Sequence, residues 1–157
     1  MAQALQDLNN RFTLLVADDD PIIRDAVDLI LRSYGYRVLF AKDGGEAISM
    51  VEAERVDLAI IDLLMPESDG FDFIMHCRRG KALASTPIIV MTAATEGEHC
   101  DRAFDLGATT YVVKPLQWAL FTHTIWYVLR NEARETELRK LKAQLGMPTK
   151  VRAPVTG

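Results

Sequence analysis

Five short apolar runs, rich in β-branched residues, are spaced along this chain of 157 residues. They do not alternate polar with apolar side chains, which is typical of strands buried on both faces of a parallel sheet. The predicted strands cover 12–17, 36–41, 58–62, 87–92 and 110–114. The segments between them carry apolar side chains at helical spacing. Alternating strands and helices predict an α/β domain, a doubly wound five-stranded parallel sheet with helices on both faces.

The segment between the first two runs has the clearest helical pattern. Pro21 suits the first turn of a helix, and Gly35 suits the left-handed residue that ends one. The apolar side chains between them lie three or four residues apart: Ile22, Ile23, Ala26, Val27, Ile30, Leu31 and Tyr34. Weaker versions of this pattern predict further helices over 45–54, 70–79 and 98–106.

The C-terminal region predicts one extended helix, because no glycine or proline interrupts the chain from Leu116 to Gly146. Thirty residues would give roughly 45 Å of helix, more than the sheet requires. We expect a main domain over 12–130, a helical extension over 131–146 and a disordered tail over 147–157. Leucines at 138, 141 and 145 have coiled-coil spacing, but Arg134 and Asn131 interrupt the pattern. Homodimerisation through this extension is therefore left open.

Composition narrows the functional class. The formal charge of −4 gives no basic field for direct nucleic-acid binding. The longest uncharged segments, 82–95 and 115–129, are shorter than the roughly 18 residues of a membrane-spanning helix. The first twelve residues lack a secretory signal pattern, and the two cysteines lack metal-binding or disulfide spacing. We expect a cytoplasmic protein with free thiols and no membrane contact.

Polar side chains follow the predicted strands at the points where the strands end. They are Asp18, Asp19, Asp20, Asp62, Thr92 and Lys114. The carboxyl ends of parallel strands lie at one edge of a sheet, so we expect these side chains to lie close together. Crowded carboxylates repel one another unless a cation is bound, and oxygen ligands suit Mg²⁺. The sequence therefore predicts a site for a hard divalent metal.

Asp62 is the best candidate nucleophile, because it follows the apolar run 58–61 and precedes Leu63 to Pro66. A carboxylate can accept a phosphoryl group and form an acyl phosphate. Transfer requires positive charge and hydrogen bonds at the phosphoryl oxygens. Mg²⁺, the Lys114 ammonium and the Thr92 hydroxyl could supply these.

The four segments LLVADDDP, IIDLLMPESDG, IIVMTAAT and YVVKPL, in this order and spacing, resemble the response-regulator receiver domain of two-component signal transduction. The resemblance covers 13–129. It implies a flavodoxin-like fold with strand order 2-1-3-4-5.

The resemblance also assigns the metal site and the acceptor. It implies that Asp62 is the phosphoacceptor and that Asp18 and Asp19 form the acidic pair that holds Mg²⁺, with Asp19 the more direct ligand. Asp62 and the backbone carbonyl of Leu64 complete the protein ligands. Asp20 then lies outside the site.

Four further residues gain roles from the same resemblance. Thr92 would bond the acyl phosphate, and Lys114 would form an ion pair with it. Pro115 would follow a cis peptide bond. Tyr111 would be the switch residue, turning inward when Thr92 moves toward the phosphate.

The implied function is a switch that accepts a phosphoryl group from a sensor histidine kinase or a histidine phosphotransfer protein. Phosphorylation would alter the face built from helix four (98–106), strand five (110–114) and helix five, the extended C-terminal helix. This change would control a partner or output domain. The chain would catalyse only its own phosphorylation and dephosphorylation. We expect slow dephosphorylation, because neither Leu64 nor Ala94 can orient a water molecule.

Two alternatives remain. Asp18 and Asp20 match the D-x-D signature of phosphatases with an aspartyl nucleophile, although Pro21 and Ile22 depart from that class. Alternatively, the chain keeps the receiver fold and acts as an interaction module without phosphate.

Overall fold

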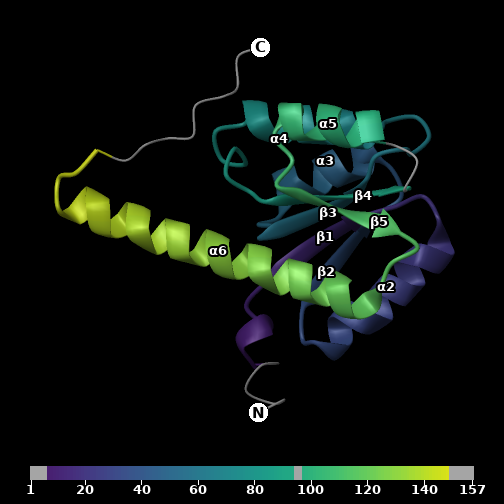
Figure 1. Cartoon of the computed structure of the whole chain (residues 1–157), viewed down its shortest axis with the longest axis horizontal. Coiled ribbons are helices and arrows are strands. Elements are labelled where there is room, and N and C mark those ends of the chain that lie inside the picture. Colours follow the sequence, from purple (N-terminus) through teal and green to yellow (C-terminus); the bar gives the residue numbers. More distant parts are fainter. Residues whose placement is uncertain (1–6, 94–96, 149–157) are drawn as a thin grey trace.

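The computed structural model describes residues 7–93 and 97–148. Strands and helices alternate along the chain, as predicted (Figure 1). The elements are β1 (Thr13–Ala17), α2 (Pro21–Ser33), β2 (Arg37–Ala41), α3 (Gly44–Ala53), β3 (Leu58–Asp62), α4 (Gly70–Arg79), β4 (Ile88–Ala93), α5 (Gly97–Leu106), β5 (Thr110–Lys114) and α6 (Trp118–Gln144). Residues 7–9 are also helical.

The five strands form one parallel sheet in the order β2-β1-β3-β4-β5, which confirms the predicted fold class and strand order. The register aligns the carboxyl ends of neighbouring strands. Ala17 pairs with Ile61, Asp62 pairs with Met91, and Ala93 pairs with Lys114. The residues that end β1, β3, β4 and β5 therefore meet at one edge of the sheet.

Helices cover both faces of the sheet, with α3, α4 and α5 on one face and α2 and α6 on the other (Figure 1). Each face has its own apolar core. Ile61 and Phe73 belong to the core under α3 and α4, whereas Ile60 and Phe121 belong to the core under α2 and α6. Every residue of β3 is buried, which explains the continuous apolar run of residues 58–61 that precedes Asp62.

Aspartate side chains begin three of the helices. The carboxylate of Asp20 accepts a hydrogen bond from the Ile22 amide at the start of α2, and Asp43 and Asp69 cap α3 and α4 in the same way. These caps satisfy amide groups that have no partner within the helix. They explain part of the acidic composition without any functional role.

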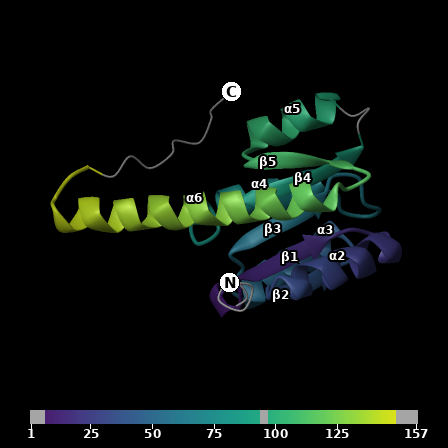
Figure 2. The same ribbon diagram turned by 60° about the horizontal axis from the view of Figure 1, so that its bottom comes forward.

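The helix α6 runs unbroken for 27 residues, so the boundary expected between residues 130 and 131 falls inside a helix. Its first half packs on the sheet through Phe121, Ile125 and Leu129. Its second half extends beyond the sheet (Figure 2). Most of the predicted tail, residues 149–157, lies outside the described residues. None of the helices in the described part of the chain combines the length and hydrophobicity needed to span a membrane.

Candidate functional site

Three carboxylates converge at the carboxyl edge of the sheet. Oxygen atoms of Asp18, Asp19 and Asp62 lie within 4.8 Å of one another. Asp18 is fully buried and Asp62 nearly so, whereas Asp19 is exposed. Two of these charges are therefore largely removed from water, and the third faces solvent at the mouth of the site.

Lys114 joins the two buried carboxylates. Its Nζ atom lies 2.7 Å from Oδ2 of Asp18 and 2.8 Å from Oδ2 of Asp62. Burial alone would lower the pKa of Lys114, but its hydrogen bonds to Asp18 and Asp62 outweigh that effect and raise the pKa. The Lys114 ammonium therefore stays charged. It is the positive charge that faces the three carboxylates of the cluster.

Both carboxylate oxygens of Asp62 are held in place. The Leu64 amide donates a hydrogen bond to Oδ1 at 3.1 Å, while Oδ2 accepts from Lys114. Burial raises the pKa of Asp62, and the bonds from Lys114 and Leu64 oppose this shift without cancelling it. The charged form of Asp62 is thus less stable than it would be in water.

The backbone at the acidic cluster is fixed by α2. The Asp20 amide donates to Oδ1 of Asp18 at 2.9 Å, and Nη1 of Arg24 donates to the Asp18 carbonyl at 2.6 Å. Because the carboxylate of Asp20 caps α2, it is engaged outside the cluster. The contact from Arg24 was not expected from the sequence, since nothing marks this arginine except its place on the polar face of α2.

The other expected site residues lie at the same edge or beside it. Thr92 is buried near the end of β4, one register position beyond Met91, the partner of Asp62. The Lys114–Pro115 peptide bond is cis. Tyr111 points outward on β5, where the residue is 45% exposed and its ring makes an edge contact with Phe104 at a centroid distance of 5.8 Å.

The donor set fits Mg²⁺. Three carboxylates and one ammonium leave a surplus of negative charge, and carboxylate oxygens are the ligands that a hard divalent cation prefers. Asp18, Asp19, Asp62 and the Leu64 carbonyl would hold it. The ligand set and the roles of Thr92, Tyr111 and Lys114 remain predictions.

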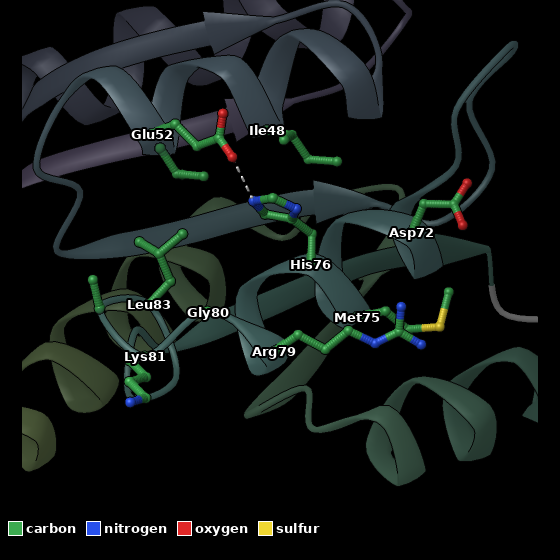
Figure 3. Close-up of a pocket in the computed structure, with 11 residues that line it drawn as sticks. Ile48, Glu52, Asp72, Met75, His76, Arg79, Gly80, Lys81 and Leu83 are labelled. Carbon is green, nitrogen blue, oxygen red and sulfur yellow. Dashed lines mark ion pairs between the residues drawn. The ribbon is translucent and has the colours of Figure 1, made fainter.

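A groove of about 730 Å³ lies elsewhere, between α3, α4 and the turn that follows α4 (Figure 3). Nε2 of His76 lies 3.1 Å from a Glu52 carboxylate oxygen across this groove. Ile48 and Val51 contribute apolar surface to its lining. None of the acidic cluster lines it, so this groove and the acidic cluster are separate sites.

A parallel sheet of this order with an acidic cluster at its carboxyl edge defines a class of signalling domain. The family model described as "Response regulator receiver domain" matches residues 14–125. The chain therefore belongs to the response regulator receiver family, as the sequence motifs suggested.

The chain is similar to curated and solved members of this family. It is 36% identical over 124 residues to the transcriptional regulatory protein AfsQ1 of Streptomyces coelicolor, covering 79% of this chain and 54% of the relative. It is 35% identical over 127 residues to the DNA-binding dual master transcriptional regulator RpaA of Synechocystis, covering 81% and 53%. The chemotaxis response regulator CheY4 of Vibrio cholerae has 33% identity and a TM-score of 0.71, covering 74% of this chain and 98% of that one.

The chain spans about half the length of the curated relatives it matches. These relatives are named as transcriptional regulators, and RpaA is named as DNA-binding. The expectation that this protein has no direct contact with nucleic acid is therefore not supported. That expectation relied on the charge of the given chain, which does not describe a longer regulator.

Proposed function

We propose that this chain is a phosphorylation-controlled switch that accepts a phosphoryl group on Asp62 from a phosphohistidine of a sensor kinase or phosphotransfer protein. The observation that carries the proposal is the environment of Asp62. Its two oxygens are oriented by Lys114 and Leu64, and it lies within 4.8 Å of two further carboxylates at the mouth of the sheet.

In this transfer an Asp62 oxygen attacks the phosphorus atom, a new O–P bond forms, and the N–P bond to the donor histidine breaks. Lys114 is already within hydrogen-bond distance of Asp62 and would follow the negative charge onto the phosphoryl oxygens. Mg²⁺ held by the acidic cluster would supply the remaining charge neutralisation. The chain then acts as a catalyst only on itself.

The switch would involve Thr92 and Tyr111. A Thr92 hydroxyl that moves toward the acyl phosphate leaves space behind β4, and Tyr111 would turn inward to fill it. The outward ring of Tyr111 would then lose its contact with Phe104 on α5. This changes the face formed by α5, β5 and α6, where a partner or output domain in the cytoplasm would detect it.

The test is phosphorylation with acetyl phosphate, with and without Mg²⁺, followed by intact mass spectrometry. Wild-type protein should gain one phosphoryl group only when Mg²⁺ is present, and Asp62→Asn should gain none. Asp20→Asn is the matched control, because it removes a carboxylate from the same acidic run while asparagine still caps α2. It should be labelled like the wild type.

Labelling of Asp62→Asn, or no labelling of wild-type protein that binds Mg²⁺, would contradict the proposal. Release of phosphate from an added phosphoester with many turnovers would favour a phosphatase. The acyl phosphate should persist for many minutes, since the Leu64 side chain provides no polar group to orient water.

A further inference from the structure

The carboxylate of Asp19 stands apart from the rest of the acidic cluster. It is exposed, and no residue in the described part of the chain donates a hydrogen bond to it. The Asp18 carboxylate, in contrast, accepts from the Asp20 amide and from Lys114. An oxygen of Asp19 nevertheless lies within 4.8 Å of oxygens of Asp18 and Asp62. The direction of the Asp19 side chain is therefore set by the backbone that carries it.

Asp19 lies between two peptide groups, and a side chain holds each of them. On its C-terminal side, the Asp20 amide donates to Oδ1 of Asp18 at 2.9 Å. On its N-terminal side, the Asp18 carbonyl accepts from Nη1 of Arg24 at 2.6 Å. A peptide group is planar, so fixing both flanking planes fixes φ and ψ of Asp19 and with them the direction of its Cα–Cβ bond.

The two hydrogen bonds differ in what anchors them. The bond between Asp18 and Asp20 closes within the loop itself. Arg24 is half-buried on α2, a helix that packs on the sheet through Val27 and Leu31. The bond from Arg24 therefore ties the peptide between Asp18 and Asp19 to a helix that is itself fixed to the core.

We propose that Arg24 is a positioning residue for the metal ligand Asp19. Its guanidinium holds the peptide group between Asp18 and Asp19, so that the Asp19 carboxylate faces the cluster before Mg²⁺ binds. A ligand that is already in place loses less conformational freedom on binding, which raises the affinity for the metal. The inference rests on the Mg²⁺ site of the proposed function and names a residue outside the ligand set that controls it.

The charge of Arg24 and its hydrogen bond have opposite effects on Mg²⁺ affinity. The guanidinium is bonded to a residue of the acidic cluster, so its positive charge lies near the site and repels a cation. Loss of this charge alone would tighten Mg²⁺ binding. Loss of the hydrogen bond frees Asp19 and weakens binding. The direction of the change therefore separates a positioning role from a purely electrostatic one.

Isothermal titration of the full chain with Mg²⁺ measures that direction. Arg24→Met removes the charge and the donor together and should raise the dissociation constant about tenfold. Arg32→Met is the matched control, because it removes the same charge from α2 at a position where the guanidinium bonds to Asp28. It should bind Mg²⁺ like the wild type. Unchanged or tighter binding by Arg24→Met, or equal weakening by Arg32→Met, overturns the proposal.

Arg24→Lys keeps the charge and one donor and should weaken Mg²⁺ binding about threefold. Urea denaturation verifies that each variant is folded. If Arg24→Met does not fold, Arg24→Lys decides the test, and binding as tight as in the wild type then overturns the proposal.

Nuclear magnetic resonance relaxation tests the positioning without any metal. The Asp19 amide belongs to the same peptide group as the Asp18 carbonyl that Arg24 holds. Its order parameter should be that of a rigid backbone in the wild type and in Arg32→Met, about 0.85, and should fall toward about 0.6 in Arg24→Met. An unchanged order parameter in Arg24→Met overturns the proposal.

The proposed function and the role of Arg24 can fail separately. Wild-type protein that binds Mg²⁺ but gains no phosphoryl group contradicts the proposed function, while the dissociation constants of the variants still decide the role of Arg24. Wild-type protein that binds no Mg²⁺ overturns the Arg24 proposal together with the metal site.

Discussion

The two edges of the sheet use charged side chains in opposite ways. At the carboxyl edge, Asp18, Asp62 and Lys114 bond mainly to one another, and negative charge remains in excess. At the amino edge, Arg78 and Asp57 bond to backbone groups, and Asp57 also forms an ion pair with Arg55. The first edge is arranged to attract a cation, whereas the second is arranged to hold the fold together.

Arg78 shows how the amino edge is built. From the last turn of α4 its guanidinium donates to the carbonyls of Gly107, Leu83, Ala84 and Thr86, at distances of 2.8 to 3.3 Å. It thereby ties α4 to the loops that precede β4 and β5. At the same edge, the Asp57 carboxylate accepts the Thr13 amide at 2.9 Å.

The comparison teaches that a half-buried charge stabilises this fold where its partners compensate it, as at Asp57 and Arg78, and destabilises it where carboxylates crowd together, as in the acidic cluster. Removing a charge should therefore destabilise the amino edge and stabilise the carboxyl edge. The predictions below test this contrast through the free energy of unfolding, from the largest change to the smallest.

Arg78→Met should lower the free energy of unfolding by about 3 kcal/mol, because several half-buried carbonyls lose a charged donor at once. Urea denaturation monitored by circular dichroism measures the change. Arg79→Met is the matched control at the next position, where the side chain is exposed, and it should change stability by less than about 0.5 kcal/mol. Equal effects of the two substitutions would contradict the role assigned to Arg78.

Gly107→Ala should cost about 2 kcal/mol. Gly107 has φ of 107°, which a residue with a side chain adopts only with strain, and an added Cβ would lie 2.8 Å from Nε of Arg78. Because the new methyl group displaces the same guanidinium, the double variant with Arg78→Met should cost less than the sum of the two. Strict additivity, again from urea denaturation, would show that the two sites are independent.

The sequence predicted the sheet and the acidic cluster because both depend on local order along the chain. The strands β3 and β5 have the predicted bounds, and Asp62 and Lys114 were found because each ends an apolar run. Arg24 and Arg78 were missed. Their partners are backbone carbonyls, and no pattern of side-chain types marks where a distant loop places a carbonyl.

Which apolar residues of α6 are exposed could not be predicted either, and the reason is different. Its first half is apolar on several sides, so the sequence does not show which apolar residues face the sheet. Only the packing of Phe121 and Ile125 leaves Leu120 and Tyr127 outside.

Asp62→Asn should raise the free energy of unfolding by about 1 kcal/mol when Mg²⁺ is removed with a chelator. The substitution relieves repulsion within the cluster and removes a charge that burial disfavours, while the Leu64 amide keeps an oxygen partner. The midpoint of thermal unfolding should rise by about 2–4 °C. Asp57→Asn at the amino edge is the control and should lower the midpoint of thermal unfolding. Two changes of the same sign would remove the contrast between the edges.

Cys77 gives an effect of similar size and makes the amino edge sensitive to alkaline pH. Burial raises the pKa of this thiol from 9.0 to about 11, and the adjacent Arg78 opposes the shift. The folded state therefore keeps the proton more tightly than the unfolded chain. The stability that this group provides is complete below pH 9 and is lost as the pH rises toward 11.

Between pH 8 and pH 10, wild-type protein should lose about 1 kcal/mol relative to Cys77→Ala, because the cavity in the variant costs the same at both pH values. Urea denaturation at the two pH values measures the difference, with Cys100→Ala as the half-buried control. Parallel losses in wild type and Cys77→Ala would show that the Cys77 thiol ionises as easily in the folded protein as in the unfolded chain.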